Sequence, residues 1–268
     1  MIRLLVPLIL AILLSPAIRA QEPAQPRVEG NTMIFDAGER LDLEKQELVI
    51  EGTFCLQKGP IELLACAPGG KDHESVLVLK CKPQNLHLAL IALGLRDKTE
   101  LGGGGPKYLG DPTRPVGDRV VVEVEFVREG RTERVRAEDL VLNGLENKSM
   151  DRAGWVFAGS SFAEEEDPET GKPTGRKVYL ANRHRSLITT YHDPTSLVDN
   201  PTLEGGNDDI FYANPAVLPA PGTPAKVCFR LPTEAEIKEM GAVEASVESR
   251  VNARMKEAGA PEGEEKQE

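Results

Sequence analysis

The side chains best suited to chemistry lie in one short stretch of the sequence. Cys55, Cys66 and Cys81 occur there together with the adjacent pair His73 and Glu74. Thiolate, imidazole and carboxylate groups are ligands that zinc, copper or iron accept in proteins. The cysteines lack the close pairing that is typical of zinc knuckles and ferredoxin-type clusters. One hypothesis is therefore a metal or thiol-redox site built on Cys55, Cys66, His73 and Glu74, although the spacing predicts no particular cofactor.

The same cysteines have two further interpretations. A turn near residues 59–60 would place Cys66 diagonally across a hairpin from Cys55, which makes these two the candidate disulfide pair. They could equally be free structural thiols. With Cys228 the chain has four cysteines, too few to replace a hydrophobic core at this length. The sequence leaves the disulfide, the free thiols and the metal or redox site open.

Three other places in the sequence carry polar side chains of lesser specificity. Asn207, Asp208 and Asp209 follow two glycines and form either a binding cluster or a turn closed by its own side chains. His87 lies among leucines, which is typical of a structural histidine. Ser160 lacks the glycine two places beyond it that a nucleophile elbow requires. Of these residues, we retain the three at 207–209 as a candidate binding site.

The elements that would position these residues are mostly short strands. Apolar runs broken by glycine over residues 32–56 predict a β-meander, and residues 76–81 predict a buried central strand. Residues 120–137 predict a hairpin whose turn at 129–130 sets Val124 opposite Val135. Further strands are predicted over residues 155–158, 177–181, 187–191, 210–213 and 225–231.

Helices are expected at two places. Pro83 and the leucines that follow predict a short core helix ending near Gly94, before a glycine- and proline-rich loop over 102–115 that could separate two lobes. Thr233 and Glu236 form a capping-box pattern at the start of an amphipathic helix predicted over 233–258. A disordered acidic tail is predicted to follow over 259–268. The predicted fold class is α+β, mainly an antiparallel β-sheet with one short core helix and a C-terminal helix. The helix stripe consists of Ile237, Met240, Val243, Val247, Val251 and Met255.

The first residues of the 268 have the pattern of a secretory signal peptide. A basic start, an apolar run over 4–14 and small residues before position 21 predict cleavage after Ala20, followed by a flexible leader over 21–31. Eleven apolar residues are too few to span a bilayer, so we expect no transmembrane helix after signal removal and a periplasmic or secreted protein. The net charge of −11, or −13 once Arg3 and Arg19 are removed, argues against nucleic acid as a partner.

Several blocks of the sequence, taken in order, resemble the YdjY-domain family, in the form of its secreted planctomycete-type members. The similarity covers about residues 45–231 and implies a single YdjY-like α+β domain over 32–232. The resemblance implies no established molecular activity, but it places Cys55, Cys66, His73 and Glu74 in matching blocks. The blocks are residues 55–62, 65–66, 71–75, 86–94, 155–160, 207–214 and 221–224.

The functional hypothesis rests on the signal-peptide pattern, the predicted sheet and the lack of a complete catalytic set in the sequence. A signal peptide, an antiparallel sheet pattern and an incomplete catalytic set favour an exported, non-enzymatic domain that binds or scaffolds an envelope component. Its partner would be an envelope protein or a small ligand. The alternative is a metal-binding or thiol-redox protein that uses Cys55, Cys66 and His73.

Overall fold

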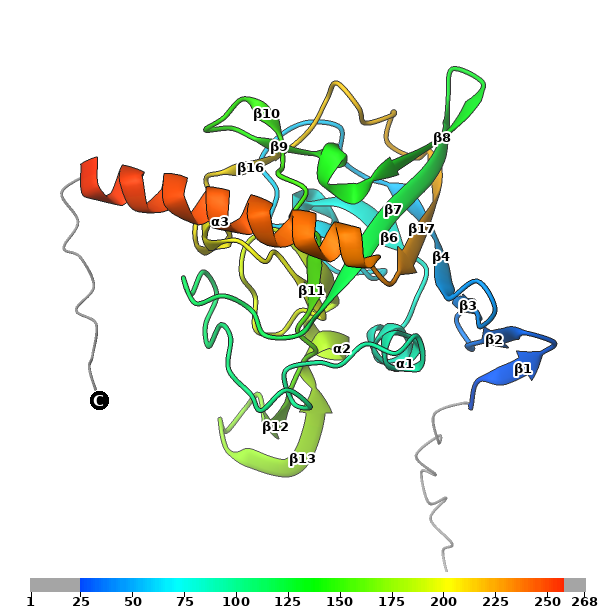
Figure 1. Ribbon diagram of the computed structural model, residues 1–268. Helices are drawn as coiled ribbons and strands as arrows, with labels where there is room; N and C mark the ends of the chain where they lie inside the picture. The colour runs from blue at the N-terminus through cyan, green and yellow to red at the C-terminus, as the bar shows by residue number, and fades with distance from the viewer. Residues whose placement is uncertain (1–24, 258–268) are drawn as a thin grey trace, which may run out of the picture.

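The computed structural model describes residues 25–257. The predicted signal peptide over 1–20 and the acidic tail predicted over 259–268 therefore lie outside the described residues. Figure 1 shows most of the strands gathered in one body, with α3 lying across it and the β12–β13 ribbon projecting from it beside α2. No helix in residues 25–257 is both long enough and apolar enough to cross a membrane.

Eight strands close into a barrel. In order around the ring they are β4, β17, β7, β11, β15, β14, β5 and β6, and β6 pairs with β4 to complete the closure. Six of these neighbouring pairs are antiparallel, whereas β14–β15 and β5–β6 are parallel. The strands are β4 (Glu47–Phe54), β5 (Leu63–Cys66), β6 (Ser75–Leu79), β7 (Asp118–Arg128), β11 (Trp155–Phe157), β14 (Ser186–Thr189), β15 (Val198–Asp199) and β17 (Pro224–Arg230).

The α+β class with a C-terminal helix is confirmed, but the barrel is mixed and the expected mainly antiparallel sheet is not confirmed. The loop over 102–115 does not separate two lobes. Strands from before it, β4, β5 and β6, and strands from after it belong to the same ring. Sequence periodicity reports which face of a strand is buried, and it does not report which distant strand lies alongside.

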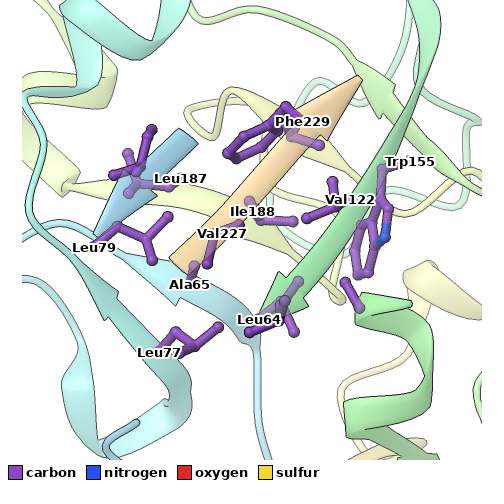
Figure 2. Packing of buried hydrophobic residues seen from close by; sticks show 14 of the residues in the cluster. Leu64, Ala65, Leu77, Leu79, Val122, Trp155, Leu187, Ile188, Val227 and Phe229 are labelled. Carbon is purple, nitrogen blue, oxygen red and sulfur yellow. The ribbon is translucent and has the colours of Figure 1, made fainter. Parts of the chain in front are cut away.

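The barrel interior is a packed apolar core. Figure 2 shows side chains from β5, β6, β7, β11, β14 and β17 converging on one cluster. A barrel of eight strands is just wide enough for side chains to fill its interior. Any ligand must therefore bind at the rim or on the outer surface. The labelled residues, all fully buried, are Leu64, Ala65, Leu77, Leu79, Val122, Trp155, Leu187, Ile188, Val227 and Phe229.

Gly52 permits the closure of the barrel. The first part of β4 pairs with β3 and its last part pairs with β6. A Cβ atom at position 52 would lie 2.7 Å from the side chain of Leu79 and 2.9 Å from the carbonyl oxygen of Val78. A side chain here would push β6 away, so the residue type follows from the close approach of two backbones.

The remaining strands attach to the barrel or stand beside it. A meander of β1, β2 and β3 extends from β4, and β8 pairs with β7 in the predicted register, with Val124 opposite Val135. Strand β1 lies within the segment predicted as a flexible leader, so regular structure begins earlier than expected. Two small sheets, β10–β9–β16 and β12–β13, complete the fold. The strands are β1 (Arg27–Glu29), β2 (Thr32–Ile34), β3 (Arg40–Asp42), β8 (Arg131–Arg136), β9 (Val141–Asn143), β10 (Lys148–Ser149), β12 (Phe162–Glu166), β13 (Pro173–Tyr179) and β16 (Phe211–Ala213).

The predicted core helix is present as α1 (Pro83–Ala92), with Pro83 in its first turn and Gly94 at a positive φ of 103° just beyond its end. Its buried side chains Leu86, Ala89 and Leu90 join the core cluster. A short helix, α2 (Leu180–His184), contacts α1. Three single turns of 3₁₀-helix are η1 (Asp72–Glu74), η2 (Ala137–Leu140) and η3 (Leu203–Gly206).

The C-terminal helix α3 (Glu234–Glu257) is attached mainly by ion pairs. Of the predicted apolar stripe, only Met240 and Val247 are buried, and Ile237 and Met255 are each about half exposed. Ion pairs join the helix to the body along its length. They are Arg230–Glu236, Arg114–Glu244, Arg119–Glu244, Arg114–Glu248, Arg250–Asp151, Arg254–Glu146 and Arg254–Glu204.

Glu236 both caps the start of α3 and forms one of these ion pairs. Its carboxylate accepts the backbone N–H of Thr233 at 2.8 Å, and the Thr233 hydroxyl accepts the N–H of Glu236 at 3.2 Å, which is the predicted capping box. The guanidinium of Arg230 also holds this carboxylate at 2.7 and 2.9 Å. Hydrogen bonding to Arg230 lowers the pKa of Glu236 from 4.5 to about 2.

We predict that Glu236→Gln destabilises the protein by on the order of 2 kcal/mol at pH 7. Because the pKa of Glu236 is lowered on folding, its contribution is complete above 4.5 and is lost as the pH falls toward 2. Chemical denaturation of wild type and variant should give free energies of unfolding that converge across this window. The control is Glu239→Gln, an exposed acid on the same helix. A difference that is independent of pH would contradict the prediction.

Candidate functional site

The structure shows that the candidate disulfide is wrong. Cys55 follows β4 and Cys66 ends β5, but β6 lies between these two strands and pairs with both. Strands two places apart in a sheet are separated by about 9.5 Å, whereas a disulfide requires Cα atoms within about 7 Å. All four cysteines are free. The hairpin assumed from the sequence does not form, because a strand from later in the chain is inserted.

The predicted metal-ligand set is also not brought together. The thiol of Cys55 donates to the backbone oxygen of Ser75 at 2.9 Å. His73 lies on η1 with 71% of its side chain exposed, and Glu74 forms an ion pair with Lys71 at 3.1 Å. Within residues 25–257, no group of three or more His, Cys, Asp or Glu side chains is placed to hold a metal ion. The metal hypothesis for Cys55, Cys66, His73 and Glu74 is therefore not supported.

Burial makes the thiols poor nucleophiles. Desolvation raises the pKa of Cys55 to about 12, and it also raises the pKa values of Cys66 and Cys81. The thiolate is the reactive form of cysteine, and it is scarce at neutral pH when the pKa is raised in this way.

The second candidate group forms a turn. Asn207, Asp208 and Asp209 are all exposed and lie between η3 and β16. The side-chain oxygen of Asn207 accepts the backbone N–H of Asp209 at 2.9 Å. This bond is the local closure that Asn commonly provides in turns. Whether these residues also bind a ligand stays a prediction.

The structure brings together a different set of polar side chains, the Tyr–His–Asp cluster of Tyr179, His87 and Asp97. His87 is on α1, Asp97 follows that helix, and Tyr179 is the last residue of β13. The Tyr179 hydroxyl lies 2.7 Å from Nδ1 of His87, and Nε2 of His87 lies 3.6 Å from the Asp97 carboxylate. The imidazole also packs edge-on against Phe157, with ring centroids 5.1 Å apart.

Burial determines the charge states in this cluster. Desolvation lowers the pKa of His87, although the nearby Asp97 acts in the opposite direction, and desolvation raises the pKa of Tyr179. A neutral imidazole that accepts the Tyr179 O–H at Nδ1 carries its proton on Nε2, the nitrogen that faces Asp97. A separation of 3.6 Å is long for a hydrogen bond between His87 and Asp97. The cluster can orient Tyr179, but it does not form a tight proton relay.

Further polar groups lie near the cluster. The ammonium of Lys98 donates to the backbone oxygen of Pro194 at 3.4 Å, and burial lowers its pKa against the opposing effect of three aspartates. One of them, Asp199, is fully buried, and this burial raises its pKa well above the usual range. Its Oδ1 atom has no hydrogen-bond partner among the described residues. Desolvation of this kind favours the protonated, uncharged form of a carboxyl group.

Ser160 has a structural role beside the same cluster. Its hydroxyl donates to the backbone oxygen of Thr195 at 2.8 Å and accepts the N–H of Ala181 at 3.1 Å. These two bonds tie the first turn of α2 to a neighbouring loop. The hydroxyl is occupied on both sides, which agrees with the sequence argument against a serine nucleophile.

Sequence reasoning treated His87 as structural and did not find its partners. His87 and Asp97 lie ten positions apart across the end of α1, which is a weak signal that could have been noticed. Tyr179 is 92 residues away from His87. No local pattern links these two residues, because the contact depends on the return of the β12–β13 ribbon to α1.

The fold and the cluster together define an α+β domain built on a closed mixed barrel with a packed core. A family model described as the YdjY domain matches residues 40–230. This is more than half of the chain, so the chain belongs to the YdjY-domain family, and the resemblance noted in the sequence is confirmed. No curated protein and no solved structure matches the chain.

We predict that Tyr179→Phe destabilises the protein by about 1–2 kcal/mol, because it leaves Nδ1 of the half-buried His87 without a donor. Urea denaturation of the variant and the wild type measures the difference. The matched control is Tyr108→Phe, which removes the hydroxyl of an exposed tyrosine. Equal midpoints for all three proteins would show that the hydrogen bond contributes nothing.

A second prediction concerns the thiols. In the folded protein at pH 8, Cys55 should react with iodoacetamide about a thousandfold more slowly than an unperturbed cysteine, because its pKa of about 12 leaves little thiolate. After unfolding in urea without reductant, intact-mass measurement should find all four cysteines alkylated. Two cysteines that stay unmodified under those conditions would reveal a disulfide.

Proposed function

We propose that this protein is an exported domain of the cell envelope that binds or scaffolds another component and catalyses no reaction. Export rests on the signal-peptide pattern over residues 1–20, which lie outside the described structure. The binding role rests on the described residues, and one observation carries it. Desolvation shifts the pKa values of His87 and Tyr179, the two hydrogen-bonded members of the Tyr–His–Asp cluster, in the directions that favour their uncharged forms.

The same trend holds for the buried candidates but not for Glu74, where the effect of desolvation is outweighed by Lys71 and the pKa is lowered. The pKa values of Cys55, Cys66, Tyr179 and Asp199 are raised by desolvation, and that of His87 is lowered. General bases and nucleophiles work best when their pKa values lie near the operating pH or when a neighbour activates them. Here burial stabilises the resting protonation states, as expected of groups that hold a structure together.

The architecture supports surface recognition for a separate reason. The core cluster fills the barrel, so the outer surface is what the domain can offer to a partner. Two elements extend that surface. The ribbon β12–β13 projects beside α2, and α3 lies across the barrel on the ion pairs described above (Figure 1).

The test uses mature protein isolated from its native cells. Its intact mass should match a chain that begins at Gln21. We expect it to show no turnover above buffer on esters, amides, phosphoesters or thiol–disulfide substrates. The variants are His87→Gln and, as a matched control, His184→Gln at an exposed position. Turnover that is lost in His87→Gln and kept in His184→Gln would overturn the non-enzymatic proposal. A mass that includes Met1 would overturn export.

A further inference from the structure

The body of the protein presents a seat for a helix, and α3 occupies it. We define the helix seat as the body residues that α3 contacts through ion pairs, together with Gly154. A Cβ atom at Gly154 would lie 2.8 Å from Sδ of Met240, so the absence of a side chain here makes room for Met240. Val247 is buried two turns further along the helix. The charged residues of the seat are Arg114, Arg119, Glu146, Asp151 and Glu204.

The helix seat has two halves of opposite charge. Its cationic half binds glutamates in the first part of α3, where Glu244 accepts from Arg114 at 2.8 Å and also pairs with Arg119. Its anionic half binds arginines in the last part of α3, where Arg254 lies 3.1 Å from Glu204. A helix laid in the reverse direction would bring like charges together in both halves. The seat therefore selects both the charge order and the direction of the helix that it binds.

The helix seat lies within the family domain, and α3 lies outside it. The YdjY match covers residues 40–230, which include every residue of the seat, whereas α3 begins at Glu234. Only residues 231–233 connect α3 to β17, the last strand of the matched domain. The domain thus provides the whole binding surface, and a segment beyond the match fills it.

The contact between α3 and the helix seat is imperfect. Nη2 of Arg114 lies 2.7 Å from the carboxylate of Glu248, yet this buried atom forms no hydrogen bond within residues 25–257, and neither does the buried Nε of Arg250. Burial also lowers the pKa of Arg119, against the effect of Glu244, because the guanidinium loses its hydration. Unmet donors and a desolvated cation weaken a contact. We therefore expect α3 to open locally while the barrel, which has its own packed core, stays folded.

We propose that the helix seat binds an amphipathic helix of a partner polypeptide, and that α3 covers the seat until this partner displaces it. The partner helix carries acids in its first half and arginines or lysines in its second half. Two apolar side chains seven positions apart take the places of Met240 and Val247. The inference rests on the proposed binding function, and it names the surface and the chemistry of the partner.

The probe is a fluorescein-labelled peptide with the sequence of residues 233–257, titrated with full-length mature protein at low salt and followed by fluorescence anisotropy. In the wild type, α3 competes with the peptide. In Glu244→Gln/Arg254→Gln, α3 loses ion pairs that the peptide keeps, so the peptide should bind this variant at least about tenfold more tightly than the wild type. The matched control is Lys238→Gln/Glu239→Gln, which removes one base and one acid at exposed positions of the same helix and should behave as the wild type.

A second peptide exchanges the two charges through Glu244→Lys and Arg254→Glu. It should bind the double variant at least about tenfold more weakly than the unchanged peptide, because like charges then meet in both halves of the helix seat.

A third measurement needs only the wild type. Hydrogen exchange followed by mass spectrometry should be on the order of tenfold faster for α3 in about 1 M than in about 0.05 M sodium chloride, because salt screens half-exposed ion pairs. Exchange of β4, β7 and β17 should not change, because these strands belong to the barrel.

Three outcomes would overturn the inference: no tighter binding of the peptide to the double variant than to the wild type, equal binding of both peptides, or exchange of α3 that does not depend on salt. The exchange measurement uses no variant, so misfolding cannot obscure it. Wild-type dimers that Glu244→Gln/Arg254→Gln abolishes, detected by sedimentation, would overturn it as well, because α3 of a second copy would then be the occupant. Turnover in the substrate screen would remove the non-enzymatic proposal and leave the helix seat in place.

Discussion

Closure of the barrel is the constraint on which the rest of the structure depends. Strand β4 must pair with β17 along one side and with β3 and then β6 along the other, and the change of partner requires the absence of a side chain at Gly52. Once closed, the ring holds an interior that side chains fill. Within residues 25–257 the barrel therefore has no open lumen for a ligand site, and polar side chains that could take part in chemistry lie at its ends and on its outer surface.

The same burial that stabilises the barrel determines the charge states around it. The pKa values of Asp199, the Cys55 thiol and the Tyr179 phenol rise, and those of His87 and Lys98 fall, because each charged form loses its hydration. A catalytic site would need some neighbouring charge to reverse this trend for one group. Asp97 acts in that direction on His87, but desolvation outweighs it. The balance favours a structural cluster that fixes Tyr179 and, through it, the base of the β12–β13 ribbon.

Local features of the fold could be predicted from the sequence, and long-range ones could not. The register of Val124 with Val135 depends on a turn between adjacent strands, where Glu129 and Gly130 both adopt positive φ. The start of α1 and the capping box of α3 depend on neighbouring residues in the same way. The insertion of β6 between β4 and β5 is different, because it requires a parallel crossover that alternation of apolar residues does not encode. Because of this insertion Cys55 and Cys66 lie at the ends of strands that are not neighbours, so neither the predicted disulfide nor the predicted metal site forms.

The attachment of the C-terminal helix α3 is another long-range feature that the sequence did not predict. Its apolar spacing correctly indicates a helix, but the side chains that attach it are mostly charged. Their partners include Arg114, Arg119 and Asp151, and Arg114 lies 130 positions away from Glu244 in the sequence. The apolar spacing and the capping box do not indicate these long-range ion pairs. In the structure, many of these acids are matched by cations of the body, half-shielded from water, where an ion pair is screened less than on an open surface. Ion pairs of this kind, together with the buried side chains of Met240 and Val247, therefore hold the helix against the body.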